Sequence, residues 1–291
     1  MPTIYHLHNI AFFRNKPAPH LNVPSFEQLT QPQDLMRADC VVVHIPSILQ
    51  TNEPDHLVNL RKIVPTEQVW VAQTHESAEN YPALNDPAFM ALFDIEISYR
   101  QKAHIWTPYI PSNLKTDYAS IKSTPRKIRS CAFISSHHDK SKRQTYMREL
   151  MQRLEVHSYG KFMRNKRILF DRGWSTKMRI MKKYTFAFAF ENAIEPDYVT
   201  EKFFQPLMTG TIPIYLGAPN IEEFSPGDNC YVSANDYLSP AQLAAHIKDI
   251  DPAAFQAWRK QPLRDNFLKK MKKLEISWQN QLAGMLKQSL N

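Results

Sequence analysis

Apolar and polar positions along the chain form short strand-like runs separated by segments with helical spacing. In the first part of the chain, runs rich in β-branched and aromatic residues begin at Thr3, Cys40, Gln68 and Phe93. In the second part, such runs begin at Cys131, Glu155, Thr185, Thr211 and Asn229. Helical spacing follows Ser141 and Val199, and Gly210 is a suitable C-cap for the second segment. Because strands that alternate with helices form parallel sheets covered on both faces, this pattern predicts the α/β class.

The alternation stops in a polar segment with three prolines, and we place a domain boundary there, near residues 110–127. The chain is long enough for two domains with separate cores. We therefore predict an N-terminal domain over 1–115, a second domain over 125–260 and a basic helical tail over 261–291.

The glycine content and the net charge limit the kinds of ligand that the protein can bind and how it can bind them. Only 6 Gly accompany 21 Pro, and neither of the glycine-rich phosphate-binding motifs occurs. A bound nucleotide would therefore need cationic side chains and helix N-termini around its phosphates. The net charge of +8 suits nucleic acid, an acidic lipid or a nucleotide sugar. Because the charge is dispersed and no nucleic-acid-binding module is recognisable, we expect no nucleic-acid partner.

The densest basic cluster lies late in the chain, at Lys269, Lys270, Lys272 and Lys273. It indicates either a solvated helix face or a peripheral contact with an anionic membrane surface. Three scattered cysteines favour reduced thiols, and the chain shows neither a signal peptide nor an apolar run long enough to span a membrane. We expect a cytoplasmic protein, with the basic tail at the inner membrane face.

The segment 185–220 carries the most chemistry. It predicts a buried strand, a polar loop and a helix that begins near Tyr198, which is where open α/β sheets bind ligands. In that place Glu201 could accept hydrogen bonds from ribose hydroxyls while Lys202 neutralises phosphate. A capped helix with a Glu–Lys pair on its surface explains the same spacing.

The string FENAIEPDYVTEKFFQPLMTGTIPIYLGAPN, which ends at Asn220, closely resembles the donor-binding signature of the α1,3/4-fucosyltransferases, glycosyltransferase family ten. Four further segments resemble the family in the same order: HESAENYP, ISYRQKAHIWTPY, ISSHHDKSKRQTYMREL and HSYGKFMRN. The resemblance covers residues 68 to 260, and the earlier residues match only in position. It implies a GT-B fold, in which two Rossmann-like domains with parallel sheets face a central cleft and the C-terminal domain binds GDP-fucose.

The resemblance also implies roles for single residues. Arg143 matches an arginine that contacts the GDP phosphates, which suits the fixed donors and permanent charge of a guanidinium. Without the resemblance, Arg143 would be assigned to a solvated basic helix. Lys202 and Glu201 match the second phosphate cation and the ribose ligand. The remaining donor-site positions are Asn192, Tyr198 and Ser135, of which Ser135 could equally be a turn residue.

Glu76 matches the catalytic base proposed for the family. A sugar hydroxyl is too weak an acid to attack unaided, so a carboxylate must take its proton as the bond to fucose forms. Inversion at the anomeric carbon needs no second carboxylate as a nucleophile. Glu79 is a nearby alternative, and Ala78 stands where proline is commoner. Taken alone, Glu76 reads as a strand-end carboxylate that caps a turn.

We expect no protein metal site and no required cofactor, because cations and a helix N-terminus can stabilise the departing GDP. A divalent cation could still stimulate the reaction. The Asp249-Ile250-Asp251 motif is interpreted as a helix start with Asp251 as N-cap. His137 and His138 are adjacent and do not converge on a metal without another ligand, whereas His6 and His8 share a strand face and could meet the acceptor.

The expected reaction is transfer of L-fucose from GDP-β-L-fucose to O3 or O4 of a GlcNAc-type residue, with inversion to an α-L-fucoside. Lewis-type lactosamine and the sugars of a lipopolysaccharide chain both remain open as acceptors. Vertebrate family members carry a membrane anchor and C-terminal cysteines that are not found here, which favours a bacterial form.

Overall fold

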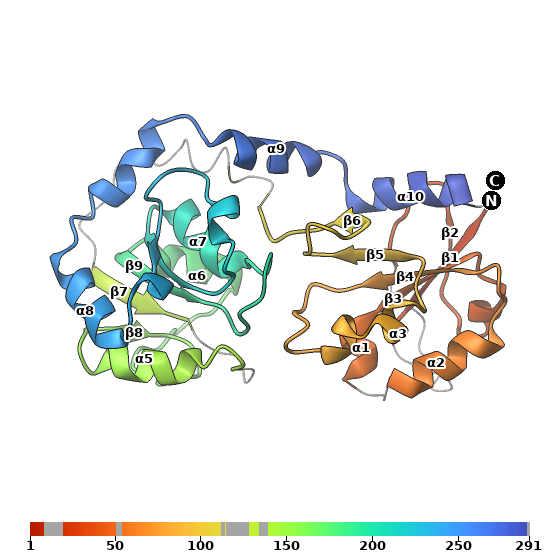
Figure 1. Cartoon of the computed structure of the whole chain (residues 1–291), viewed down its shortest axis with the longest axis horizontal. Helices are drawn as coiled ribbons and strands as arrows, with labels where there is room; N and C mark the ends of the chain where they lie inside the picture. Colours follow the sequence, from red (N-terminus) through yellow and green to blue (C-terminus); the bar gives the residue numbers. More distant parts are fainter. Residues whose placement is uncertain (9–19, 51–53, 112–113, 115–127, 134–138, 290–291) are drawn as a thin grey trace. The chain divides into compact units, whose positions relative to one another are not determined.

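The computed structural model describes residues 1–8, 20–50, 54–111, 114, 128–133 and 139–289. It divides into two compact units (Figure 1). Unit 1 comprises Met1–Pro108 together with Lys273–Asn291, and unit 2 comprises Tyr109–Lys272.

Within the described residues, unit 1 contains a six-stranded parallel sheet with the order β2-β1-β3-β4-β5-β6. Its strands are β1 (Thr3–Leu7), β2 (Glu27–Leu29), β3 (Cys40–His44), β4 (Val69–Gln73), β5 (Ile95–Ser98) and β6 (Ile105–Trp106). Its α-helices are α1 (Ile45–Leu49), α2 (Pro54–Ile63), α3 (Pro87–Met90) and α10 (Trp278–Ser289). The parallel strands end at one edge of the sheet, and the loops that follow them gather there.

Both faces of this sheet are covered, which explains the unbroken apolar run in β3. Val41 and Val43 belong to the cluster on one face, whereas Val42 joins the cluster on the other face. That second cluster includes Leu282 and Leu286 of α10, so the end of the chain completes the core of unit 1. Alternate residues of a strand point to opposite faces, and here both faces are apolar.

Unit 2 contains a second parallel sheet, with the order β11-β10-β9-β7-β8 in the residues that can be described. Its strands are β7 (Ile128–Ala132), β8 (His157–Ser158), β9 (Tyr184–Phe190), β10 (Ile212–Leu216) and β11 (Val232–Ser233). Its α-helices are α5 (Arg143–Met151), α6 (Trp174–Met181), α7 (Glu201–Thr209), α8 (Pro240–Asp249) and α9 (Asp265–Lys273).

The central strand β9 divides its side chains between two clusters. Phe186, Phe188 and Phe190 pack with residues of α5 and α8, whereas Ala187 packs with Met181 of α6. Large residues therefore fill the space under α5 and α8, and small ones allow α6 to approach the strand closely.

The α/β class and the two parallel sheets confirm the predicted fold class. The predicted start of one helix is wrong, because α7 begins at Glu201 and not near Tyr198. The Thr200 hydroxyl caps this helix by accepting a hydrogen bond from the Lys202 amide. Gly210 adopts φ 70° as the predicted C-cap. The sequence pattern did not predict β2 and β6.

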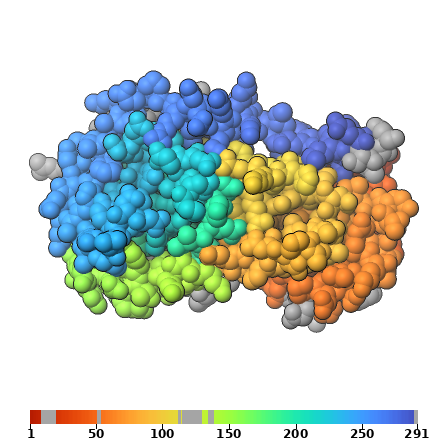
Figure 2. Space-filling view, in the orientation of Figure 1, coloured from red at the N-terminus to blue at the C-terminus, as the bar shows by residue number. Residues whose placement is uncertain are grey.

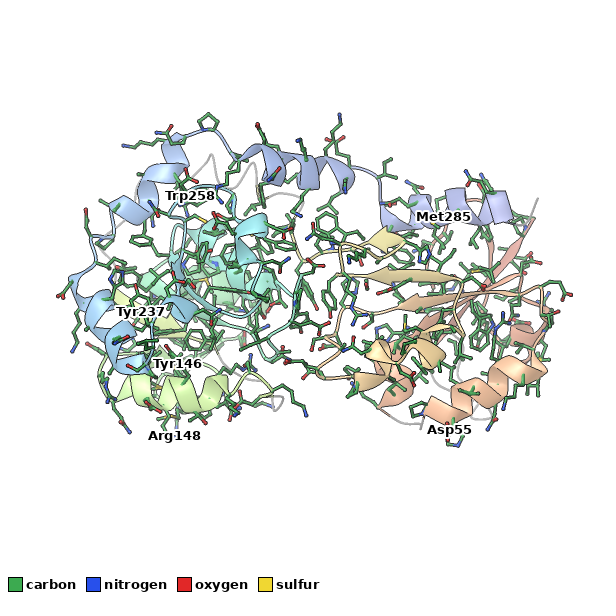
Figure 3. The ribbon with its side chains drawn as sticks, in the orientation of Figure 1. Asp55, Tyr146, Arg148, Tyr237, Trp258 and Met285 are labelled. Atoms are coloured by element: carbon green, nitrogen blue, oxygen red, sulfur yellow. The ribbon has the colours of Figure 1, made fainter. Side chains whose placement is uncertain are left out.

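The residues predicted as a separate tail are divided between the two units. The segment from α8 to α9 runs over the surface of unit 2 (Figure 2). Of the predicted tail 261–291, Phe267 of α9 is completely buried there. Met285 of α10 instead packs against the sheet of unit 1 (Figure 3). Among the described residues, no helix has the length and apolar character of a membrane span.

Candidate active site

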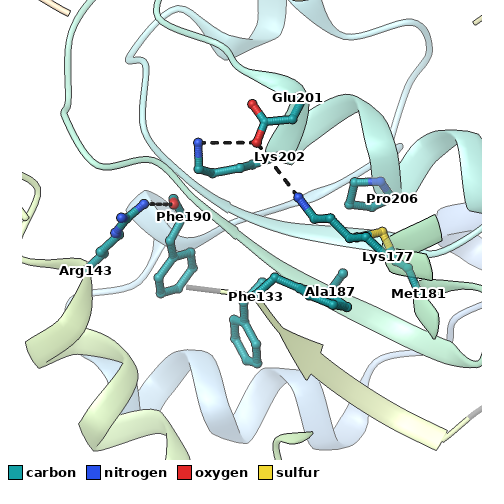
Figure 4. Close-up of a pocket in the computed structure, with 10 residues that line it drawn as sticks. Phe133, Arg143, Lys177, Met181, Ala187, Phe190, Glu201, Lys202 and Pro206 are labelled. Atoms are coloured by element: carbon teal, nitrogen blue, oxygen red, sulfur yellow. Dashed lines mark hydrogen bonds and ion pairs between the residues drawn. The ribbon is translucent and has the colours of Figure 1, made fainter. Parts of the chain in front are cut away.

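A cavity of about 300 Å³ lies in unit 2, where β9 ends and α7 begins (Figure 4). Its wall combines apolar side chains with three cations and a carboxylate. The lining residues are Phe133, Arg143, Lys177, Met181, Ala187, Phe188, Phe190, Glu201, Lys202 and Pro206. This is the carboxyl end of a parallel sheet, the usual ligand position in such folds.

Glu191, the first residue after β9, lies completely buried behind this wall. Its carboxylate accepts hydrogen bonds from the Thr200 amide at 2.8 Å and from the Thr200 hydroxyl at 2.8 Å, and it pairs with Lys202 Nζ at 3.2 Å. Burial raises the pKa of Glu191, and Lys202 and Thr200 oppose the increase. The carboxylate therefore connects the end of β9 to the first turn of α7.

Lys202 and Lys177 both point toward the carboxylate of Glu201 (Figure 4). Lys202 Nζ lies 3.7 Å from Glu201 Oε1, and Lys177 Nζ lies 3.8 Å from the same oxygen. Burial lowers the pKa of Lys202, but Glu191 and Glu201 more than offset it, so the net pKa is raised. Burial lowers the pKa of Lys177, with a further contribution from Lys202. Burial alone would raise the pKa of Glu201, and the two lysines hold it below its ordinary value.

Arg143 is the first residue of α5, and its side chain is 1% exposed. Its Nη1 donates to the carbonyl oxygen of Phe190 at 3.0 Å, and its Nε lies 4.0 Å from Asp139. Burial lowers the pKa of Arg143 from its ordinary value, and Glu191 and Asp139 act in the opposite direction. A guanidinium stays charged under these conditions, so Arg143 places a fixed positive charge in the cavity wall.

Asn192 and Tyr198 form a hydrogen-bonded pair in the loop between β9 and α7. The Tyr198 hydroxyl donates to Asn192 Oδ1 at 3.1 Å, and both side chains are buried. A Cβ atom on Gly217 would lie 2.5 Å from Glu191 Cγ and 2.5 Å from the Tyr215 hydroxyl. Only glycine therefore fits beside the buried carboxylate at this position.

A second cavity, of about 430 Å³, shares Phe133 and Lys177 with the first. Lys161 and Arg164 also line it, and Phe133 stacks on Tyr159 with a ring-centroid distance of 5.3 Å. The two cavities together offer apolar surface, aromatic faces and several cations.

Glu76 lies in unit 1, in the loop after β4. Its side chain is half-buried, and its amide donates to the Thr74 hydroxyl at 3.0 Å. Ala78 is buried in the core under this loop, while Glu79 is half-buried. The position at the carboxyl edge of the sheet leaves the Glu76 carboxylate beside solvent.

A group of histidines lies at the same edge of unit 1. The rings of His8 and His44 stack at 4.6 Å, and His6 meets His8 edge to face at 4.0 Å. The Ser47 hydroxyl lies 2.7 Å from His44 Nδ1 and 3.3 Å from His8 Nδ1. Burial lowers the pKa of His44 to about 4, assisted by His8 and His75. The His44 ring is therefore uncharged near neutral pH, and burial also lowers the pKa of His8.

The prediction that Asp251 of the Asp249-Ile250-Asp251 motif is a helix N-cap is wrong. Asp251 Oδ1 accepts the amide of Ala253 at 2.9 Å, and the following 3₁₀ helix begins at Ala254. Asp251 thus closes a turn and does not act as a helix N-cap. In the described part of the chain, no group of three or more acidic, histidine or cysteine residues has the arrangement of a metal site.

Arg143, Glu201 and Lys202 meet in one cavity wall, and Asn192 and Tyr198 lie directly beside it. The predicted positions of Ser135, His137 and His138 lie outside the described residues.

Sequence reasoning assigned no role to Glu191 or Lys177. Glu191 directly follows the run FAFAF, so an acidic residue at the end of a buried strand could have been recognised from the sequence. Lys177 is followed by Arg179, Lys182 and Lys183, so nothing in its sequence surroundings distinguishes it from a surface lysine.

Comparisons with known proteins give the same family for both units. Residues 5–110 match the fucosyltransferase N-terminal domain, and residues 123–282 match the C-terminal domain of glycosyltransferase family 10 (fucosyltransferase). Alpha-(1,3)-fucosyltransferase B of Drosophila melanogaster is 31% identical over 202 residues, which are 63% of this chain and 46% of that protein. GDP-fucose protein O-fucosyltransferase 3 of Homo sapiens is 30% identical over 198 residues, 62% of this chain and 41% of that protein. The aligned segment thus spans less than half of these curated relatives.

Solved structures share the fold at low sequence identity. An α1,3-fucosyltransferase crystal structure superposes with a TM-score of 0.66 at 15% identity and covers 100% of this chain and 90% of that one. The structure of an α1,3-fucosyltransferase with GDP-fucose gives 0.60 at 14% identity, covering 100% and 92%.

Proposed function

The chain belongs to glycosyltransferase family 10, the fucosyltransferases, and from this premise we propose that it transfers L-fucose from GDP-fucose to a sugar hydroxyl with inversion at the anomeric carbon. The observation that carries the proposal is the cationic cavity of unit 2. Arg143, Lys177 and Lys202 surround a space at the start of α7, and this is the charge and geometry that a diphosphate needs.

In this proposal the GDP diphosphate lies against Arg143 and Lys202. Fucose transfer leaves the bonding electron pair on a β-phosphate oxygen, and these fixed cations stabilise the charge that develops there. Glu201 accepts hydrogen bonds from the ribose hydroxyls, because its two lysine partners leave oxygen lone pairs available. The adjoining cavity supplies aromatic faces for guanine at Phe133 and Tyr159.

Glu76 is the proposed base. It takes the proton of the acceptor hydroxyl while the oxygen bonds to C1 of fucose, on the side opposite to the departing GDP. Its place after β4, half-buried and beside solvent, suits a group that receives a proton and then returns it to water. Proton transfer of this kind contributes about 10²–10⁴ in rate.

The matched test compares Glu76→Gln with Glu79→Gln. We expect Glu76→Gln to lower fucose transfer by about 10²–10⁴ while GDP binding, measured by calorimetry, stays unchanged. Glu79→Gln should keep transfer. The opposite result would assign the base to Glu79, and a wild-type protein that binds no GDP would contradict the donor itself.

The proposed acceptor is an oligosaccharide or a lipopolysaccharide-type glycan, fucosylated at O3 or O4 of a GlcNAc-type residue. Neither a required cofactor nor a protein metal site is part of the proposal, and fucose transfer that persists in EDTA is the expected result. An acceptor panel with GDP-fucose, read by NMR, distinguishes the two linkages. Failure of every GlcNAc-containing acceptor would overturn this assignment.

We also propose a cytoplasmic location, with α9 as a peripheral contact to the inner membrane face. Lys269, Lys272 and Lys273 are exposed on this helix, whereas Lys270 is ion-paired with Glu223. Binding to vesicles of anionic phospholipid should therefore weaken in Lys272→Gln/Lys273→Gln. Equal binding by the wild type and this variant would remove α9 from the proposal.

A further inference from the structure

The segment 161–174 of unit 2 exposes large apolar side chains among cations. The exposed fractions are 86% for Leu169, 82% for Phe170, 55% for Trp174 and 42% for Met163. Large apolar patches on the surface of a soluble protein usually mark an interaction site, and these four exposed side chains all belong to one short segment.

Hydrogen bonds and apolar packing hold this segment in a defined conformation. Asn165 fixes its first half to β8, because its side chain accepts the Ser158 amide at 2.8 Å and donates to the Val156 carbonyl oxygen at 2.8 Å. Two other apolar residues, Phe162 and Ile168, pack inward against the clusters of unit 2. The segment therefore contributes inward-facing residues to the core, and its remaining apolar side chains face solvent.

The charges around these apolar side chains are almost all positive. Five cations lie in the segment against one carboxylate, that of Asp171. The cations are Lys161, Arg164, Lys166, Arg167 and Arg172, and all five are exposed. Amphipathic surfaces that combine Trp, Phe and Leu with Lys and Arg suit the boundary between anionic headgroups and acyl chains.

We propose that the segment 161–174 docks unit 2 on an anionic lipid surface. Leu169, Phe170 and Trp174 enter the headgroup boundary, while Lys166 and Arg167 contact lipid phosphates. Other residues of the segment, including Lys161 and Arg164, line the second cavity. Docking would therefore place this cavity, which the proposed function assigns to guanine, close to the membrane surface. The lipid contact itself does not depend on the proposed reaction.

The test is co-sedimentation of the full chain with vesicles of phosphatidylcholine alone or mixed with phosphatidylglycerol. We expect binding to the mixed vesicles that weakens with salt. Lys166→Gln/Arg167→Gln should weaken it by about 10- to 30-fold, since each basic residue near an anionic surface contributes about fivefold or somewhat less. The exposed pair Lys182→Gln/Lys183→Gln, in the same unit, is the matched control and should bind as the wild type does.

An apolar pair tests the insertion. Leu169→Ser/Phe170→Ser should lower vesicle binding at least tenfold, whereas Leu238→Ser, which removes a leucine 94% exposed elsewhere in unit 2, should leave it unchanged. Trp174 should shift its fluorescence to the blue on binding, and Trp174→Phe should lose the shift.

Three results would overturn the proposal. The first is a wild-type protein that ignores anionic vesicles. The second is an apolar variant that separates a dimer into monomers in the ultracentrifuge while keeping vesicle binding, which would assign the surface to a second copy of the chain. The third is vesicle binding that is lost in the α9 variant Lys272→Gln/Lys273→Gln but kept in the variants of the segment 161–174.

Discussion

The ion pair between Glu191 and Lys202 makes a quantitative prediction about stability. Glu191 is completely buried, and the Lys202 side chain is 27% exposed. Replacing Lys202 by Met leaves the carboxylate without its closest cation, at 3.2 Å in the native protein. Removing one partner of a buried pair costs about 3–5 kcal/mol. Because Lys202 is partly exposed, we expect a smaller loss of about 2–3 kcal/mol.

In a unit of this size, that loss corresponds to a decrease in Tm of about 5–10 °C in scanning calorimetry. Lys183→Met, which removes an exposed lysine, is the control and should change the stability by at most about 0.5 kcal/mol. The loss in Lys202→Met should also depend on pH. Without Lys202, the native pKa of Glu191 rises further above the unfolded value, so the native state retains a proton that the unfolded state releases. The deficit is therefore largest at pH 8 and shrinks as the pH falls toward 5.

A double-mutant cycle separates the pair from the rest of the site. In a Glu191→Gln background the buried carboxylate that Lys202 neutralises is gone, and Lys202→Met should cost only about 1 kcal/mol or less. Glu191→Gln alone keeps Lys202 and should still bind GDP. A Lys202→Met deficit that is equal at pH 5 and pH 8, or equal in both backgrounds, would refute the electrostatic reasoning.

Two further predictions concern packing and protonation. Gly217→Ala should destabilise unit 2 by about 1–3 kcal/mol, because its Cβ would meet Glu191 and Tyr215 at 2.5 Å. The Cβ of Gly284→Ala in α10 meets no atom within 4 Å, so this variant should stabilise unit 1 by about 0.5–1 kcal/mol. Calorimetry of both variants measures the two changes in stability. Burial lowers the pKa of His44 to about 4 in the folded protein, so the unfolded state binds the proton more readily. The free energy of unfolding should therefore fall as the pH drops from about 6.5 toward 4. Because solvent surrounds part of this half-buried ring, the expected loss is only about 1–2 kcal/mol. Urea unfolding at pH 7 and pH 5 should show a smaller loss of unfolding free energy in His44→Phe than in the wild type.

The sequence predicted those parts of the fold in which local pattern and tertiary environment agree. The runs that became β3, β4, β9 and β10 are predominantly apolar, as expected for strands covered on both faces. The strand β2 has three residues and β6 has two, so neither is long enough to show a period. The divided C-terminal region was not predictable, because α9 and α10 have similar helical spacing and only their tertiary partners assign them to different units.

The candidate site follows the same rule. The spacing around Glu201 and Lys202 places both in the first turn of a helix, which the structure confirms. Arg143 was ambiguous by spacing, since its burial depends on a hydrogen bond to Phe190, 47 residues further along the chain. Lys177 likewise reaches the cavity only through the packing of α6 against the sheet. Long-range contacts of this kind leave no local pattern.

The buried carboxylate of Glu191 explains how the cations of unit 2 stay in position. Arg143, Lys177 and Lys202 repel one another, and a cavity without counter-charges would let the lysines turn toward water. Glu191 and Glu201 hold the two lysine ammonium groups within 3.2–3.8 Å, so the positive charges are already oriented for the diphosphate that we propose binds there. The desolvation of Glu191 costs stability, and in the proposed reaction the same contacts preorganise the cations around the departing phosphate. A carboxylate inside a phosphate site, which looks unfavourable by charge alone, is thus consistent with cations that must not move during the reaction.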